Sequence, residues 1–125
     1  MIVVDTSIWI DHFRGGNVAL TRALEAGVVL MHLFVIGEIA CGKLTRRGEI
    51  LALLAAMPQA PVATHAEAMQ WVERQALAGD GIGWVDVHLL ASTALAPGAR
   101  LWTRDRRLET VALAAGLLYE PAAAG

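Results

Sequence analysis

Short apolar runs alternate with longer stretches of helical period along this chain, and that alternation limits the folds it can adopt. The first run, residues 1–4, is too short for a helix and is typical of a buried strand that ends at Asp5. Strands alternating with helices predict an α/β fold, with a mainly parallel central sheet of four or five short strands flanked by helices. The other expected strands are residues 28–32, 61–63, 100–103 and 117–119.

Capping residues and helix breakers place the helices between these strands. Asn17 is expected to cap a helix that stops at Gly27, and Thr64 with Glu67 has the spacing of a capping box. Thr6 or Ser7 is expected to cap a short helix that reaches Phe13, and further helices are expected at 18–26, 35–44, 47–56, 65–78, 84–96 and 106–115.

Composition narrows the class of protein. The chain has 125 residues, of which 56% are hydrophobic and 18% charged, so intrinsic disorder is excluded. No apolar stretch approaches the ~20 residues of a membrane-spanning helix. The single Cys41 excludes an intramolecular disulfide and a cysteine-built zinc site. We therefore expect a soluble, cytoplasmic protein with one domain over 1–120 and a short alanine-rich tail, 121–125, that frays.

Acidic residues follow two of the expected strands. Asp5 comes directly after the first strand, and Asp105 comes just after the strand at 100–103. In parallel sheets, functional sites lie outside the carboxyl ends of the strands, so both side chains are expected at the same edge. Taken alone, each residue is better explained as a helix N-cap, which is a common role for aspartate.

Two further acids are expected to face the same edge from helices. Asp86 precedes Leu89 and Leu90 by one turn, so it lies at the start of the buried stripe of its helix and is expected to face the sheet edge. Alternatively, it serves only to compensate the helix dipole in the first turn. Glu38 lies on a helix with a strongly apolar stripe, and a solvated helix face is its alternative. Oxygen ligands of this kind suit Mg²⁺ or Mn²⁺. Because the chain has no nucleotide-binding loop, a carboxylate-held ion indicates phosphodiester hydrolysis.

Four segments resemble the motifs of a known family in that family's order. Residues 3–7, VVDTS, resemble the opening of PIN-domain ribonucleases. Three further segments resemble the second, third and fourth acidic motifs of VapC-type toxins. They are residues 34–42 (FVIGEIACG), 83–92 (GWVDVHLLAS) and 101–108 (LWTRDRRL). These segments span nearly the whole chain, so the resemblance is specific.

The resemblance implies a PIN-like fold and a Mg²⁺- or Mn²⁺-dependent endoribonuclease that hydrolyses RNA with metal-activated water. It further implies the toxin of a type II toxin–antitoxin pair, neutralised by a VapB-type antitoxin and usually a homodimer. The metal-binding and catalytic acids would be Asp5, Glu38, Asp86 and Asp105. Thr6 and Thr103, which neighbour two of them, would position water or the acids. No further acid is assigned, because Arg106 and Arg107 follow Asp105.

Basic and aromatic residues are expected to support RNA binding or simple packing. We expect the basic side chains near the acids to contact RNA phosphates; the alternative is an ordinary solvated surface. These side chains are Lys43, Arg46, Arg47, Arg104, Arg106 and Arg107.

We expect the tryptophans to lie in the core or at a dimer interface; the alternative is stacking on RNA bases. They are Trp9, Trp71, Trp84 and Trp102. The four histidines lack paired ligand spacing and are expected at the surface or hydrogen-bonded.

Three other functions compete with this interpretation. A phosphoaspartate enzyme needs a second aspartate where Ser7 stands. A receiver-like, Mg²⁺-binding signalling module needs an acceptor aspartate in mid-chain, but none lies between Asp11 and Asp80. A PIN-type nuclease of RNA processing, with no antitoxin, stays open.

Overall fold

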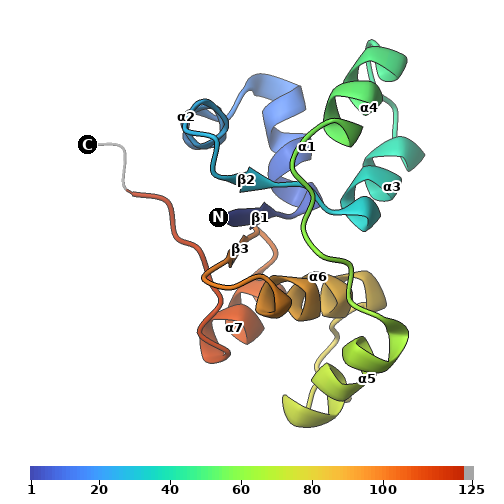
Figure 1. The fold of residues 1–125 in the computed structure, drawn as a ribbon, viewed down its shortest axis with the longest axis vertical. Coiled ribbons are helices and arrows are strands. Elements are labelled where there is room, and N and C mark those ends of the chain that lie inside the picture. The colour runs from blue at the N-terminus through green and yellow to red at the C-terminus, as the bar shows by residue number, and fades with distance from the viewer. Residues whose placement is uncertain (123–125) are drawn as a thin grey trace.

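The computed structural model describes residues 1–122, so the last three residues of the expected tail, 123–125, lie outside the described residues. Within that part of the chain, three short strands are flanked by seven helices (Figure 1). The strands are β1 (Ile2–Val4), β2 (Val29–Leu30) and β3 (Arg100–Trp102). The helices are α1 (Thr6–Gly15), α2 (Val18–Glu25), α3 (Leu33–Cys41), α4 (Arg47–Ala55), α5 (His65–Arg74), α6 (Trp84–Leu95) and α7 (Arg106–Ala114).

The first strand is the centre of the sheet. The strand order is β2-β1-β3 and both pairings are parallel, with Ile2 opposite Val29 and Val4 opposite Trp102. All three residues of β1 are buried, as expected for a parallel strand covered on both faces. The predicted α/β fold with a parallel sheet is confirmed.

Two of the expected strands are absent as strands. The run at 117–119 pairs only through Leu118, opposite Leu101. The run at 61–63 forms no strand, and the chain makes a single bridge earlier, between Gln59 and Met31. That bridge cannot lengthen because the partner segment turns into α3 directly after Met31, with His32 as the helix cap.

Most helix starts agree with the sequence, and the ends differ more. Asn17 caps α2 by accepting from the Leu20 N–H, and Thr64 forms the expected capping box with Glu67 on α5. The third helix begins at Leu33, two residues early, because the His32 ring accepts the Phe34 N–H and caps it. It ends at Cys41, before the predicted Leu44.

The helices form two groups about the strands. Figure 1 shows α1 to α4 on one side of the sheet and α5 to α7 on the other. The core between them includes Val3, Leu20, Leu90, Leu101 and Leu108, each with no exposed surface. None of the described helices is long and apolar enough to cross a membrane. The starts of α1, α6 and α7 supply three of the four predicted acids.

Candidate active site

Asp5 is fixed at the carboxyl end of β1. Its N–H donates to the Trp102 carbonyl (2.9 Å), which extends the pairing with β3, and its side chain is only 6% exposed. Asp5 is also the N-cap of α1, so the Thr6 or Ser7 cap that the sequence predicted is wrong. One carboxylate oxygen accepts from the Thr6 N–H (2.7 Å), and the other accepts from Ser7 Oγ (2.8 Å) and Thr103 Oγ1 (2.7 Å). Three donors therefore orient a buried carboxylate and satisfy it.

Thr103 links the first acid to the last. Besides donating to Asp5 Oδ2, its hydroxyl accepts the Asp105 N–H (3.1 Å). Asp105 is the N-cap of α7, where its Oδ1 accepts from the Leu108 N–H (3.1 Å). The two interpretations of Asp5 and Asp105 are thus compatible: each caps a helix and each also lies at the edge of the sheet.

Ser7 is a site residue that sequence reasoning missed. Its hydroxyl donates to Asp5 Oδ2, accepts the Arg104 N–H (3.1 Å) and lies 3.4 Å from Thr103 Oγ1. The signal that could have found it is its position two residues after Asp5, where a hydroxyl can bond back to the preceding carboxylate.

Glu38 joins the site from α3. Its side chain is exposed, and its Oε1 accepts a hydrogen bond from Thr6 Oγ1 (2.7 Å). Val35 and Ile39, buried on either side of Glu38 in the sequence, anchor α3 to the core. Because Thr6 follows Asp5, this one contact holds the second acid near the first.

Asp86 shares its environment with the other three acids. It lies in the first turn of α6 and is half-buried. Burial raises the pKa of its carboxyl to about 6, and the negative charges of Asp5, Asp105 and Glu38 add to that rise. A hydrogen bond from the Gly83 backbone opposes the rise in pKa. The fold therefore brings the four predicted acids close enough together to act on one another.

The donor chemistry of this site fits a hydrated divalent ion. Among residues 1–122, the two ion pairs are Arg46 with Glu49 and Arg104 with Asp11, so no basic side chain neutralises the four acids. No three Asp, Glu, His or Cys side chains in that range converge into a closed ligand cluster. Mg²⁺ and Mn²⁺ suit oxygen donors, and Mg²⁺ is commonly held by one or two carboxylates while keeping several waters. The arrangement suits such an ion better than zinc.

The predicted RNA-contacting cations occupy several environments. Arg104 points to Asp11 Oδ1 (2.6 Å), and Arg46 pairs with Glu49 (3.4 Å). Arg107 lies against Gly81 in the loop before α6, so closely that a Cβ on this glycine would be 2.7 Å from the guanidinium. Lys43, Arg47 and Arg106 are exposed.

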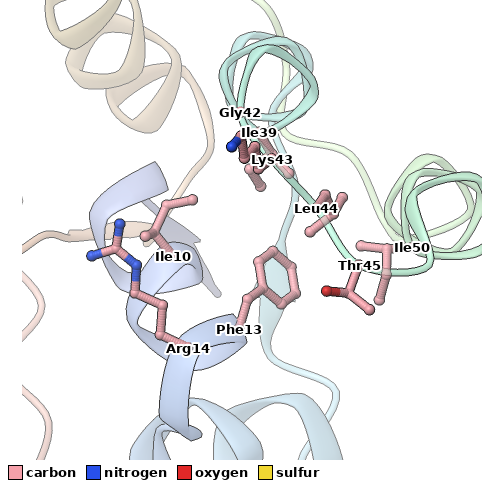
Figure 2. A pocket seen from close by; sticks show the side chains of 9 residues that line it. All are labelled: Ile10, Phe13, Arg14, Ile39, Gly42, Lys43, Leu44, Thr45 and Ile50. Carbon is pink, nitrogen blue, oxygen red and sulfur yellow. The ribbon is translucent and has the colours of Figure 1, made fainter.

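A separate hollow lies between α1, α3 and the start of α4. It has a volume of about 430 Å³, and none of the four acids lines it. In Figure 2, Phe13 of α1 points toward Leu44 and Ile50. The remaining lining residues are Ile10, Arg14, Ile39, Gly42, Lys43 and Thr45. The third helix thus serves both places, with Glu38 in the acidic site and Ile39 in the hollow.

Comparison with known proteins identifies relatives. Residues 2–113 match the family model described as the PIN domain. The chain is 45% identical over 117 residues to a protein named Ribonuclease VapC32 from Mycobacterium tuberculosis strain CDC 1551 / Oshkosh. The protein of the same name from strain ATCC 25618 / H37Rv has the same identity. Each alignment covers 94% of this chain and 94% of the relative.

Proposed function

Because this chain belongs to the PIN domain family, and within it to the VapC-type ribonucleases, we propose that it is a metal-dependent endoribonuclease and the toxin of a toxin–antitoxin pair. The observation that supports the proposal is the hydrogen-bonded link from Glu38 through Thr6 to Asp5 and through Thr103 to Asp105, at the carboxyl ends of β1 and β3. Membership of this family sets aside the receiver-like and phosphoaspartate alternatives.

The four acids hold Mg²⁺ or Mn²⁺ in this proposal, and each hydroxyl around them has a defined task. Ser7 and Thr103 orient Asp5, and Thr6 holds Glu38 beside it. When bound, the ion would lower the pKa of a coordinated water, which would act as the nucleophile, and would offset charge on the attacked phosphate. Asp86 and Asp105 belong to the other group of helices, so the ion would be held between the two groups.

The proposed partners are RNA, a VapB-type antitoxin and a second copy of the chain. Phosphate contacts are assigned to Lys43, Arg46, Arg104, Arg106 and Arg107, because basic side chains bind the RNA backbone without reading its sequence. The second copy and the antitoxin are proposed from the family, and exposed apolar side chains such as Val18 and Leu53 are candidates for contacts with them. Light scattering should report a dimer, and a monomer at micromolar concentration would remove that part of the proposal.

Glu38→Gln is the sharpest test of the activity. Glu38 is exposed and its Oε1 already accepts from Thr6, so the amide keeps the shape and the acceptor while removing one charge. We expect cleavage of bacterial RNA to fall roughly 100-fold or more, as for loss of a group that stabilises transition-state charge. Glu73→Gln, at an exposed glutamate on α5, is the matched control and should keep full activity.

Two observations would overturn the proposal at different levels. Wild-type protein that leaves RNA intact with both Mg²⁺ and Mn²⁺ would exclude the nuclease. Cleavage that persists in the presence of the protein encoded by an adjoining short reading frame would instead favour an RNA-processing nuclease over a toxin. The ends of the RNA fragments, sequenced after brief expression, then identify the bonds that are cut.

A further inference from the structure

A continuous row of aromatic rings runs from the core to the surface beside the acidic site. Its inner end is His32, which has no exposed surface. The ring centroids are 5.2 Å apart between His32 and Phe34, 4.7 Å between Phe34 and His88, and 4.8 Å between His88 and Trp84. The last step, from Trp84 to the exposed His65, is 5.2 Å. The rings come from α6 and from the starts of α3 and α5.

The inner end of this aromatic row is rigidly held. His32 Nδ1 accepts the Phe34 N–H (2.9 Å), which leaves the proton on Nε2 to be donated to Ser92 Oγ (2.9 Å). Ser92 Oγ also accepts the Ala63 N–H (3.0 Å). His88, which follows Phe34 in the row, is only 5% exposed. The planes of the His88 and Trp84 rings meet at 88°. Trp84 is therefore presented to solvent on a fixed support.

The middle of the row reaches the acids through Phe34. Phe34 precedes Glu38 by four residues on α3, so the two side chains share one face of that helix. Trp84 begins α6 two residues before Asp86, and that spacing turns the two side chains to different faces of α6. Trp84 is instead linked to Phe34 through His88, which contacts both rings. A strand of RNA that contacts Glu38 and continues along the row therefore reaches Trp84.

Trp84 differs from the other tryptophans in its exposure. Trp9 and Trp102 are 3% and 5% exposed and belong to the core, and Trp71 is partly buried against it. Trp84 is 41% exposed although burial of its large ring would be favourable. Its ring neighbours are histidines, whose polar edges and π-faces suit a nucleobase better than they suit an aliphatic side chain.

We propose that Trp84, supported by His88 and flanked by His65, is a stacking subsite for an unpaired nucleobase of the RNA, near the phosphodiester that is hydrolysed at the four acids. The inference rests on the proposed ribonuclease function and adds a substrate contact to it. Stacking on an aromatic ring tolerates any base but requires that the base be unpaired, so the subsite selects single-stranded positions.

The test distinguishes the effect of the aromatic ring of Trp84 from the effect of an apolar side chain at that position. Trp84→Leu removes the ring and keeps an apolar side chain, Trp84→Tyr keeps a ring, and Leu113→Ala changes an exposed residue at the far end of α7 from Asp105. Fluorescence anisotropy, with chelator present to prevent cleavage, measures binding of a labelled oligouridylate. It also measures binding of an oligomer of equal length with an abasic nucleotide.

Trp84→Leu is expected to weaken binding of the oligouridylate about 5- to 100-fold, the range found for loss of one stacked base. Trp84→Tyr and Leu113→Ala should bind as the wild type does. The wild type should bind the abasic oligomer more weakly, whereas Trp84→Leu should no longer distinguish the two oligomers. In cleavage assays the loss should appear in KM and leave kcat nearly unchanged.

Other outcomes would overturn the subsite. Equal binding of the two oligomers by the wild type contradicts stacking, and this comparison holds even if Trp84→Leu fails to fold. A dimer that dissociates in Trp84→Leu, with RNA affinity per folded chain unchanged, would assign Trp84 to a protein interface. Wild-type protein that cleaves RNA while failing these tests loses only the subsite, whereas protein that cleaves no RNA loses the proposed function.

Discussion

At the scale of single residues, Thr103 shows how few atoms hold the acids together. One hydroxyl donates to Asp5 and accepts from the Asp105 backbone, so two acids that follow different strands share one anchor. The edge at which the acids lie could be predicted, because strand ends and helical spacing indicate it. The contact of Ser7 with Asp5 is local and could also have been predicted, but its contacts with Arg104 and Thr103, 97 and 96 residues away, could not. Local spacing carries no information on such distant partners.

Thr103→Val should be harmful to both stability and activity. Valine has the shape of threonine, but it leaves the buried Asp5 oxygen with one donor fewer and the Asp105 N–H without its acceptor. We expect a loss of roughly 1–3 kcal/mol in the free energy of unfolding, the usual cost of unsatisfied buried polar groups. Urea denaturation measures it. Thr103→Ser should restore most of the loss, and Thr110→Val, whose hydroxyl bonds the Arg106 carbonyl at the surface, should change little.

At the scale of elements, the starts of helices were more predictable than their ends or the short strands. A capping residue such as Asn17 or Thr64 acts within three residues, so the sequence displays it directly. The expected strand at 117–119 depends instead on a partner elsewhere in the chain, and only Leu118 pairs. The cap of α3 was also missed, because His32 acts there through its ring nitrogen and histidine is not among the preferred caps.

His32 should make the stability of the fold depend on pH. Burial, and then the charge of His88, lower the pKa of His32 from 6.5 to about 4. The unfolded chain therefore binds the extra proton more readily than the folded one, and stability rises with pH between these two values. Neutral His32 contributes up to about 3 kcal/mol to the free energy of unfolding. This contribution is fully present above pH 6.5 and is lost as the pH falls toward 4.

Urea denaturation across this pH range checks the prediction. His32→Asn keeps a capping oxygen for α3 but cannot take up a proton, so its stability should vary less with pH than that of the wild type. Part of the dependence should remain, because burial also lowers the pKa of His88. Parallel pH curves for the two proteins would show that His32 is not the titrating group.

At the scale of the whole molecule, two groups of helices bring like charges together across the sheet. Asp5 and Glu38 belong to the α1 to α4 side, and Asp86 and Asp105 belong to the α5 to α7 side. Without a cation, their repulsion opposes the packing of these two groups. The sequence could predict the edge at which they meet, but not how close they lie, because that depends on how the helices pack.

Asp86→Asn should therefore stabilise the metal-free protein while abolishing most of its activity. The amide still accepts from the Gly83 backbone but removes one of four repelling charges. We expect a gain on the order of 1 kcal/mol after solvent screening. Thermal unfolding with a chelator measures it.

Addition of Mg²⁺ or Mn²⁺ should reverse the order of stability, since an ion that binds only the folded state stabilises the wild type by mass action. The Asp86→Asn variant has one carboxylate fewer to hold the ion, so its gain should be smaller. A variant less stable than the wild type with chelator, or an equal metal response in both proteins, would contradict the repulsion between the acids. Glu73→Gln serves as the control for loss of a negative charge elsewhere.

The pairing of β1 with β3 also sets the order of events while the protein is being made. Asp5 is made 98 residues before the Thr103 hydroxyl that orients it. Domains fold as units once enough of the chain has emerged, so a nascent or truncated chain lacking β3 has no assembled acidic site. The carboxylate that ends β1 therefore has to await β3 before it can take part in catalysis, whatever the order in which the helices between them fold.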